Sequence, residues 1–208
     1  MNRVILDFVI SGGPVMIPII ICCLVVWFLI VEKHFLLKKE SRDSAKFTED
    51  VIRLLAAKKI EEVKSLCLSK QNAVSDTFLE LLSSERENRD TYLATAEQIF
   101  HEKYPKLEKG VATISVLATI EPLLSLLGTV TGMVATFTTI TLHGAGNPQL
   151  LAKGISEALI TTASGLMVSI PAMYFHNSIS KKIDDIMNDL EKSSMKLINF
   201  LTLKSTNE

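Results

Sequence analysis

The stretch PLLSLLGTVTGMVATFTTIT, residues 122–141, is apolar enough for a membrane, yet Ser, Thr or Gly recurs along its whole length. It belongs to a longer apolar run, residues 111–142, whose one charged side chain is Glu121. As an α-helix this run would be about 48 Å long, at about 1.5 Å per residue. The hydrocarbon core of a bilayer is roughly 30 Å thick. The sequence therefore predicts a membrane-spanning helix that projects beyond the bilayer on one side.

Two other runs have the same character. Residues 15–31 are uncharged, and residues 155–175 contain one charged side chain, Glu157. The first run is followed by EKHFLLKKE, residues 32–40, which is typical of a stop-transfer flank and not of a signal-peptide cleavage site. We therefore expect an all-α integral membrane protein with three transmembrane helices, whose long helices extend into a cytoplasmic helical domain.

Positive charge is distributed unevenly around these runs. The loop of residues 143–154 holds only Lys153, and the N-terminal segment only Arg3. The basic residues on the other flanks are Lys33, Lys38, Lys39, Arg42, Lys46, Lys103, Lys106, Lys109, Lys181 and Lys182. Because Lys and Arg concentrate on the cytoplasmic side of membrane proteins, the N-terminus is expected outside and the C-terminus inside.

The resulting division of the chain has seven segments. They are an N-terminal periplasmic segment (1–14), a first span (15–33), a cytoplasmic helical domain (34–109), a second span (110–142), a periplasmic loop (143–154), a third span (155–176) and a cytoplasmic amphipathic tail (177–208).

Composition excludes several classes of function. The 208 residues have a mean hydropathy of +0.30 and a net charge of −1, without the basic patch of a nucleic-acid-binding protein. Three cysteines and four dispersed histidines show no metal-ligand spacing. With no nucleophile–base pair in view, we expect neither an enzyme nor a bound cofactor or metal.

The predicted cytoplasmic domain has the periodicity of packed helices. Turns are expected at residues 57–59 and 70–73, and SSERENRD, residues 83–90, is expected to be an exposed break. Asp90 is a candidate cap for a long helix that continues into the second span with a kink at Pro105. The tail carries apolar residues on one helical face, which needs a partner surface: Ile183, Ile186, Leu190, Leu197 and Leu201.

Heptad spacing collects the small and hydroxyl residues of the second span on one face. This face is Ala118, Pro122, Ser125, Thr129, Gly132, Thr136 and Thr139. The opposite face is bulky and aliphatic or aromatic. The third span has a matching small face, made of Gly154, Ala158, Thr162, Gly165, Ser169 and Ala172. Two successive spans with matched small faces are expected to meet a common neighbour.

Two interpretations of these faces stay open. Small residues at four-residue spacing, as in Gly128-x-x-x-Gly132, allow two helices to pack closely, and we assign this role to Gly128, Gly132, Gly165, Pro122 and Pro171. Alternatively, a long hydroxyl-rich stripe suits a lumen shared with water or another helix. The candidates for such a proton pathway are Thr129, Thr162, Glu157, Ser125, Thr136, Ser169 and Glu121.

The two carboxylates also have alternative interpretations. An intramembrane carboxylate is a candidate functional group, which favours a role in ion movement for Glu157 over simple pairing with Lys153. Glu121 is expected either at the mouth of the lumen or simply solvated near the cytoplasmic side.

The motifs IEPLLSLLGTVTGMVATF, residues 120–137, and GISEALITTASGLMVSIPAMYFHN, residues 154–177, resemble the MotA/TolQ/ExbB proton-channel family, most closely its ExbB/TolQ branch. The resemblance extends over essentially the whole chain. It implies a multi-pass protein of the bacterial inner membrane that forms a pentamer around an ExbD/TolR-type partner, whose single span occupies the lumen. It also implies that protons, passing an aspartate of that partner, drive work passed on to TonB or TolA.

The same resemblance assigns roles in the proton path to Thr129, Thr162 and Glu157. It also shows departures: Glu121 replaces a small residue, Ser125 replaces a usual Gly, and Ser164 stands where an apolar residue is common. The function expected is a proton-channel or stator subunit for TonB-dependent outer-membrane transport. The alternatives are a TolQ-type subunit of the Tol-Pal system, a flagellar MotA-type stator, a non-conducting scaffold and, least of all, a membrane enzyme.

Overall fold

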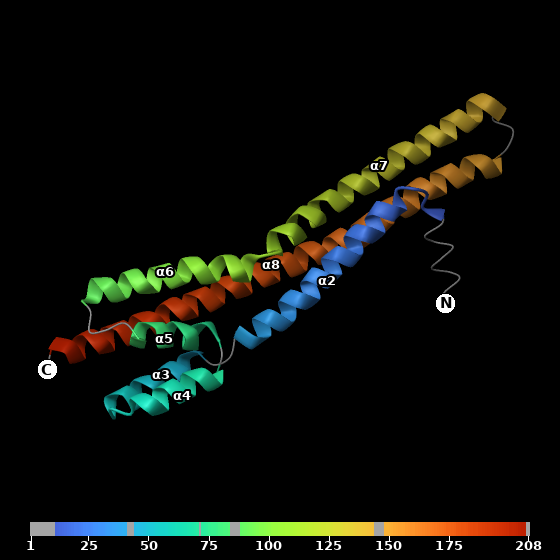
Figure 1. Ribbon diagram of the computed structural model, residues 1–208. Helices are drawn as coiled ribbons and strands as arrows, with labels where there is room; N and C mark the ends of the chain where they lie inside the picture. The colour runs from blue at the N-terminus through green and yellow to red at the C-terminus, as the bar shows by residue number, and fades with distance from the viewer. Residues whose placement is uncertain (1–10, 41–43, 71, 84–87, 144–147, 207–208) are drawn as a thin grey trace. The chain divides into compact units, whose positions relative to one another are not determined.

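The computed structural model describes residues 11–40, 44–70, 72–83, 88–143 and 148–206. These residues form helices without any strand: α2 (Met16–Glu40), α3 (Ser44–Ala56), α4 (Ile60–Lys70), α5 (Ala73–Ser83), α6 (Arg89–Glu108), α7 (Val111–His143) and α8 (Pro148–Thr206) (Figure 1). The predicted all-α class is confirmed over this part of the chain. Most of the predicted N-terminal segment, Arg42 and the centre of the predicted break at 83–90 lie outside the described residues.

The chain divides into two compact units. Residues 1–32 and 110–178 form one, here called the span unit, and residues 33–109 and 179–208 form the other, here called the helical domain. Helices α2 and α8 each continue from one unit into the other. Within the described residues, three helical stretches are long and apolar enough to cross a membrane, and they include α2, most of α7 and most of α8. This confirms the three predicted candidates.

Two helix boundaries differ from the sequence prediction. Asn88, and not Asp90, caps α6: its side chain accepts a hydrogen bond from the Arg89 amide at 2.8 Å. The break before the second span falls at Gly110 and not at Pro105, because Gly110 adopts a left-handed φ of 86°. Pro105 is accommodated inside α6. Because Gly110 has no Cβ, it takes the left-handed conformation at little cost, and α6 and α7 are therefore separate helices.

The helical domain is built on one apolar core. Helices α3 to α6 and the last part of α8 contribute buried residues, and the Phe47 and Phe78 rings stack with centroids 5.7 Å apart. Leu190 and Leu197 of α8 are fully buried in this core, and Leu201 packs against it. The predicted apolar face of the tail therefore finds its partner surface in its own chain. Each such leucine contributes about 1.5–3 kcal/mol through burial.

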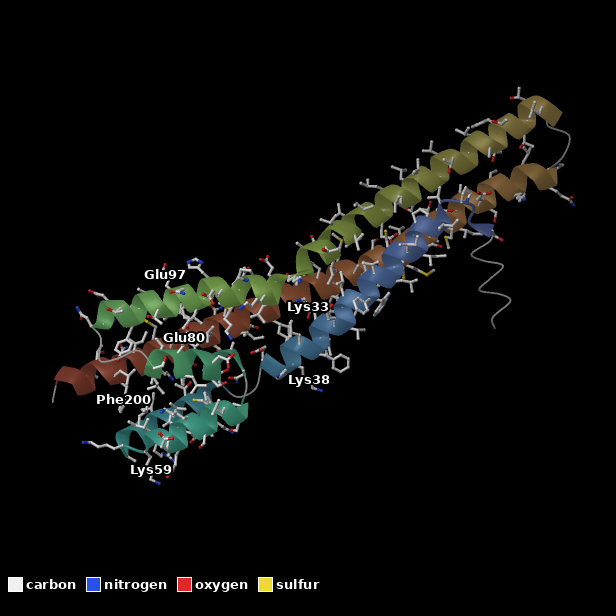
Figure 2. All side chains as sticks on the ribbon, in the orientation of Figure 1. Lys33, Lys38, Lys59, Glu80, Glu97 and Phe200 are labelled. Atoms are coloured by element: carbon white, nitrogen blue, oxygen red, sulfur yellow. The ribbon has the colours of Figure 1, made fainter. Side chains whose placement is uncertain are left out.

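Polar groups close the ends of two helices in this domain. Lys33 is 3% exposed, and its Nζ donates to the Leu107 carbonyl oxygen at 2.9 Å, near the C-terminus of α6. Glu40 Oε2 accepts from the Ala73 amide at 2.7 Å, at the N-terminus of α5. Both charges have the sign that stabilises the helix end they contact. Figure 2 shows Lys33 and Lys38 on α2, Lys59 between α3 and α4, and Glu97 on α6.

Cys67 is a buried thiol in the same core. Its side chain is 1% exposed, and burial, aided by the nearby charge of Asp76, raises the pKa of the thiol to about 11. Because the thiolate is the reactive form, we expect Cys67 in the folded protein to resist alkylation at about pH 8. In a Cys22→Ser, Cys23→Ser background, iodoacetamide should modify Cys67 slowly before denaturation and completely after it. Rapid modification of the folded protein would contradict this prediction.

Candidate functional site

Helix α7 presents one buried stripe in the span unit. Its members are less than a tenth exposed and recur at intervals of three or four residues: Val111, Ile114, Ala118, Glu121, Ser125, Gly128, Gly132 and Thr136. Helix α8 presents a second stripe, made of Ala158, Thr161, Ser164, Gly165, Ser169 and Ala172. Apart from Val111, Ile114 and Glu121, these side chains are small, and the two helices approach closely as a result.

Four glycines mark this approach. A Cβ atom on Gly128 would overlap the Thr161 side chain, and one on Gly154 would overlap Thr136 Oγ1. A Cβ on Gly132 would lie 3.0 Å from the Ala158 Cβ.

The fourth, Gly165, lies against Ser125 and the carbonyl oxygen of Glu121. Pro122 and Pro171, predicted with these glycines as packing residues, are half-buried inside α7 and α8.

The buried stripes differ by one residue from the faces expected from heptad spacing. On α7, Glu121 and Gly128 are buried where Pro122 and Thr129 were expected; on α8, Thr161 replaces Thr162. Successive residues on a helix point about 100° apart, so this shift moves Thr129 and Thr162 to the flanks of the contact. Both are half-buried.

The predicted pathway residues consequently fall into two groups. Ser125, Thr136, Ser169 and Glu121 are covered by their own chain. Thr129, Thr162 and Glu157 are half-buried and keep part of their surface accessible. Among the predicted pathway residues, only those of the second group can line a surface between neighbouring chains, as long as the helices keep this packing.

The hydroxyl groups are bonded locally. Thr129 Oγ1 donates to the Leu126 carbonyl oxygen at 2.7 Å, and Thr162 Oγ1 donates to that of Ala158 at 3.0 Å. Ser125 and Thr136 make the same kind of bond within α7, at 3.0 and 2.9 Å. A hydroxyl that donates to its own helix still has an acceptor lone pair. Thr129 and Thr162 can therefore accept a hydrogen bond from water or from a protonated carboxyl group.

Glu157 lies against the turn that precedes α2. A Cβ on Gly13 would overlap the Glu157 carboxyl group, and Gly13 has a left-handed φ of 72°. Thr161 Oγ1 donates to the carbonyl oxygen of Gly12 at 2.8 Å. Sequence reasoning missed Gly12 and Gly13 as neighbours of Glu157. The consecutive glycines before Pro14 are the signal that the chain makes a tight approach here.

Glu121 has the most unusual surroundings in the span unit. Its side chain is 0% exposed, and neither carboxyl oxygen has a hydrogen-bond partner among the described residues. Cys22 and Cys23 of α2 lie within electrostatic range of it. The expected positions at a lumen mouth or in solvent therefore do not describe this side chain, because its own chain covers it completely.

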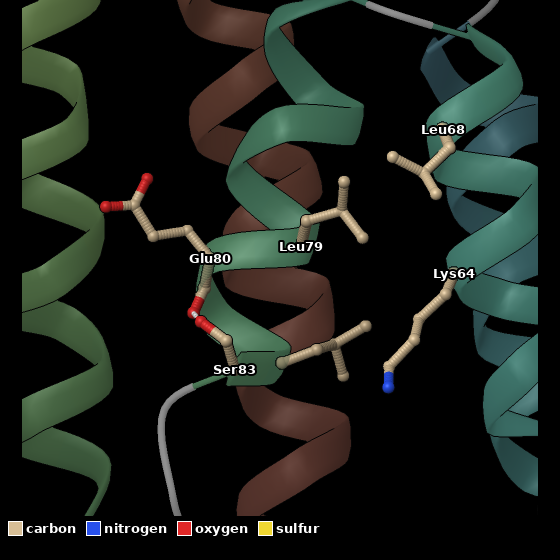
Figure 3. A pocket seen from close by; sticks show the side chains of 6 residues that line it. Lys64, Leu68, Leu79, Glu80 and Ser83 are labelled. Carbon is tan, nitrogen blue, oxygen red and sulfur yellow. Dashed lines mark hydrogen bonds between the residues drawn. The ribbon is translucent and has the colours of Figure 1, made fainter.

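The helical domain contains a separate surface pocket of about 650 Å³ between α4 and α5. Figure 3 shows Leu68 and Lys64 on one side and Leu79, Glu80 and Ser83 on the other. The Ser83 hydroxyl donates to the Glu80 carbonyl oxygen at 2.8 Å, and Lys64 pairs with Glu61. The lining combines three leucines with Lys64, Glu80 and Ser83.

The sequence profile of the MotA/TolQ/ExbB proton channel family matches residues 50–192, which is well over half of the chain. The chain belongs to this family. The match includes α7 and most of α8, so the close contact described above lies within the family region. The family consists of channel proteins that energise transport, and not of enzymes.

Individual relatives carry both ExbB and TolQ names. An ExbB-like biopolymer transport protein of Synechocystis is 29% identical over 172 residues, which is 80% of each chain. The Tol-Pal system protein TolQ of Haemophilus influenzae is 36% identical over 83 residues, covering 40% of this chain and 36% of its own. Biopolymer transport protein exbB1 of Vibrio cholerae is 34% identical over 91 residues, covering 43% and 40%.

The contact between Gly128 and Thr161 gives a testable prediction. The Thr161 methyl carbon is the nearest atom to a Cβ placed on Gly128. Gly128→Ala should therefore destabilise the protein by about 1–3 kcal/mol through overpacking. Thr161→Ser removes that methyl and retains the hydroxyl that bonds Gly12, so it should restore part of the loss.

Thermal unfolding in detergent of the two single variants and the double variant would measure this coupling, expected above about 0.5 kcal/mol. Val130→Ala, on the exposed face of α7, is the matched control. Strictly additive effects of Gly128→Ala and Thr161→Ser would contradict the contact.

Proposed function

We propose that this chain is an inner-membrane proton-channel or stator subunit that works with an ExbD-type partner and uses the proton motive force to energise TonB-dependent outer-membrane transport. The observation that carries the proposal is the family match together with the α7–α8 pair. This pair leaves Thr129 and Thr162 partly accessible on its flanks.

The chain's own accessible groups suit a supporting role in proton movement. Thr129 and Thr162 offer acceptor lone pairs, and Glu157 offers a carboxyl group, which we assign to proton entry near the outer face. A hydroxyl accepts a hydrogen bond but does not store a proton at physiological pH. The proposal therefore assigns the titrating carboxylate of the lumen to the partner's single span, with the proton as coupling ion and no other cofactor.

Orientation and assembly are part of the same proposal. The positive flanks of the three spans support an outside N-terminus and a cytoplasmic helical domain. Helix α7 also exposes a bulky apolar face that includes Leu123, Val130 and Phe137. Such faces suit contact with lipid or neighbouring copies, in keeping with a pentamer around the partner helix.

A TolQ-type subunit of the Tol-Pal system is the second candidate. The similarity to a TolQ of Haemophilus influenzae supports it, and both systems would use the same span chemistry. Co-purification separates the two: a TolR-like partner with TolA would favour the Tol system, and an ExbD-like partner with TonB the first candidate.

The flank hydroxyls provide the test of function. Thr162→Val and Thr129→Val keep side-chain size but remove the acceptor oxygen. Each should lower proton-driven activity by about tenfold or more, equivalent to at least about 1.4 kcal/mol in the barrier. The measurement is proton uptake by vesicles that contain the chain and its partner.

Thr138→Val is the matched control, because Thr138 is exposed on α7 and its hydroxyl also donates to a carbonyl oxygen of its own helix. Unchanged proton uptake in Thr129→Val and Thr162→Val, with intact assembly, would remove both hydroxyls from the path. Complete absence of uptake in the unaltered complex would favour a non-conducting scaffold.

A further inference from the structure

Glu121 is a carboxyl group without a visible counter-charge. It is fully buried, and both of its oxygens lack hydrogen-bond partners among the described residues. A carboxylate anion in such surroundings costs several kcal/mol unless a cation or several donors compensate it. A proton on the carboxyl group removes this charge.

The helices around Glu121 supply no compensating cation. Residues 15–31, 122–142 and 158–180 contain no Asp, Glu, Lys or Arg. The titratable groups of α2 that lie within electrostatic range are the Cys22 and Cys23 thiols.

On α8, Gly165 lies beside Glu121: a Cβ placed on Gly165 would be 3.1 Å from the Glu121 carbonyl oxygen. The nearest titratable groups of α8 in sequence, Glu157 and Tyr174, are at least about 12 Å from Gly165 along the helix. On α2, Glu32 is likewise at least about 12 Å from Cys23 along the helix.

The position of Glu121 links its charge to helix packing. It is part of the buried stripe of α7, one turn before Ser125, which fills the space in front of Gly165. An anion here could gain water only if the helices separated at this level. A neutral carboxyl group is compatible with the closed contact.

We propose that Glu121 is a proton-binding site enclosed within each chain, and that a proton on its carboxyl group keeps α7 packed against its neighbours. This site differs from the lumen path, because Glu121 is covered by its own chain. Its role in a transport cycle rests on the proposed function: loss of this proton would loosen the same helices that present Thr129 and Thr162.

Infrared spectroscopy tests the site directly. The full chain in lipid nanodiscs should show the C=O stretching band of a neutral carboxyl group at near-neutral pH. Glu121→Gln, which is neutral and of equal size, should lose this band. Glu157→Gln, a matched change of the other carboxylate in the spans, should retain it. Identical spectra for the unaltered chain and Glu121→Gln would overturn the proposal.

Carbodiimide labelling tests the unaltered chain without any variant. Dicyclohexylcarbodiimide enters lipid and reacts with protonated carboxyl groups, so peptide mass spectrometry should find label on Glu121 that decreases as pH rises. Absence of label there, together with absence of the infrared band, would overturn the proposal. Protection by Na⁺ at constant pH would also overturn it, because the site would then bind a cation and not a proton.

The packing role has its own measurement. As pH rises above neutral, the unaltered chain should lose thermal stability relative to Glu121→Gln, because the anion that forms has no partner inside the contact. Glu157→Gln should follow the unaltered chain. A stability difference that is the same at every pH would overturn the packing role. None of these measurements depends on proton flux, so failure of the proposed function would be seen separately.

Discussion

The close contact between α7 and α8 is the constraint on which the span unit depends. Two helices can approach this closely only where side chains are nearly absent, and Gly128, Gly132, Gly154 and Gly165 provide such positions on both helices. Without water or a strong hydrophobic force between helices, close packing and hydrogen bonding hold spans together in a membrane. Thr161 contributes both, because its methyl faces Gly128 and its hydroxyl bonds the turn before α2.

This contact determines which polar groups stay accessible. Hydroxyls inside it, such as those of Ser125 and Thr136, satisfy carbonyl oxygens of α7 and are covered by α8. Thr129 and Thr162 lie beside it and are positioned by the same packing. The two interpretations of the small faces, packing and lumen lining, are thus compatible: the centre of each stripe serves the first, and the flank is available for the second.

Glu121 shows how such a contact can contain a titratable group. Its side chain is larger than its neighbours and lies one turn from Ser125, whose side chain occupies the space in front of Gly165. The burial of a group that changes charge makes the packing of a helix pair sensitive to proton concentration. In a family of proton channels, this property would connect the ion to the shape of the protein without a further binding pocket.

The helical class, the three candidate spans and the apolar face of the tail follow from the amino-acid sequence, because hydrophobic length and periodicity are local properties. The sequence also indicated that the small faces of the second and third spans would contact a neighbouring helix or water. Which edge of each face is buried became visible only in the folded chain, where Glu121 is buried in place of Pro122 and Thr161 in place of Thr162. One residue is a rotation of about 100° on a helix, and that rotation is set by contacts with neighbouring helices that no periodicity encodes. The capping of α6 by Asn88 and the break at Gly110 are local, but several nearby residues were equally suitable by sequence, so periodicity did not select between them.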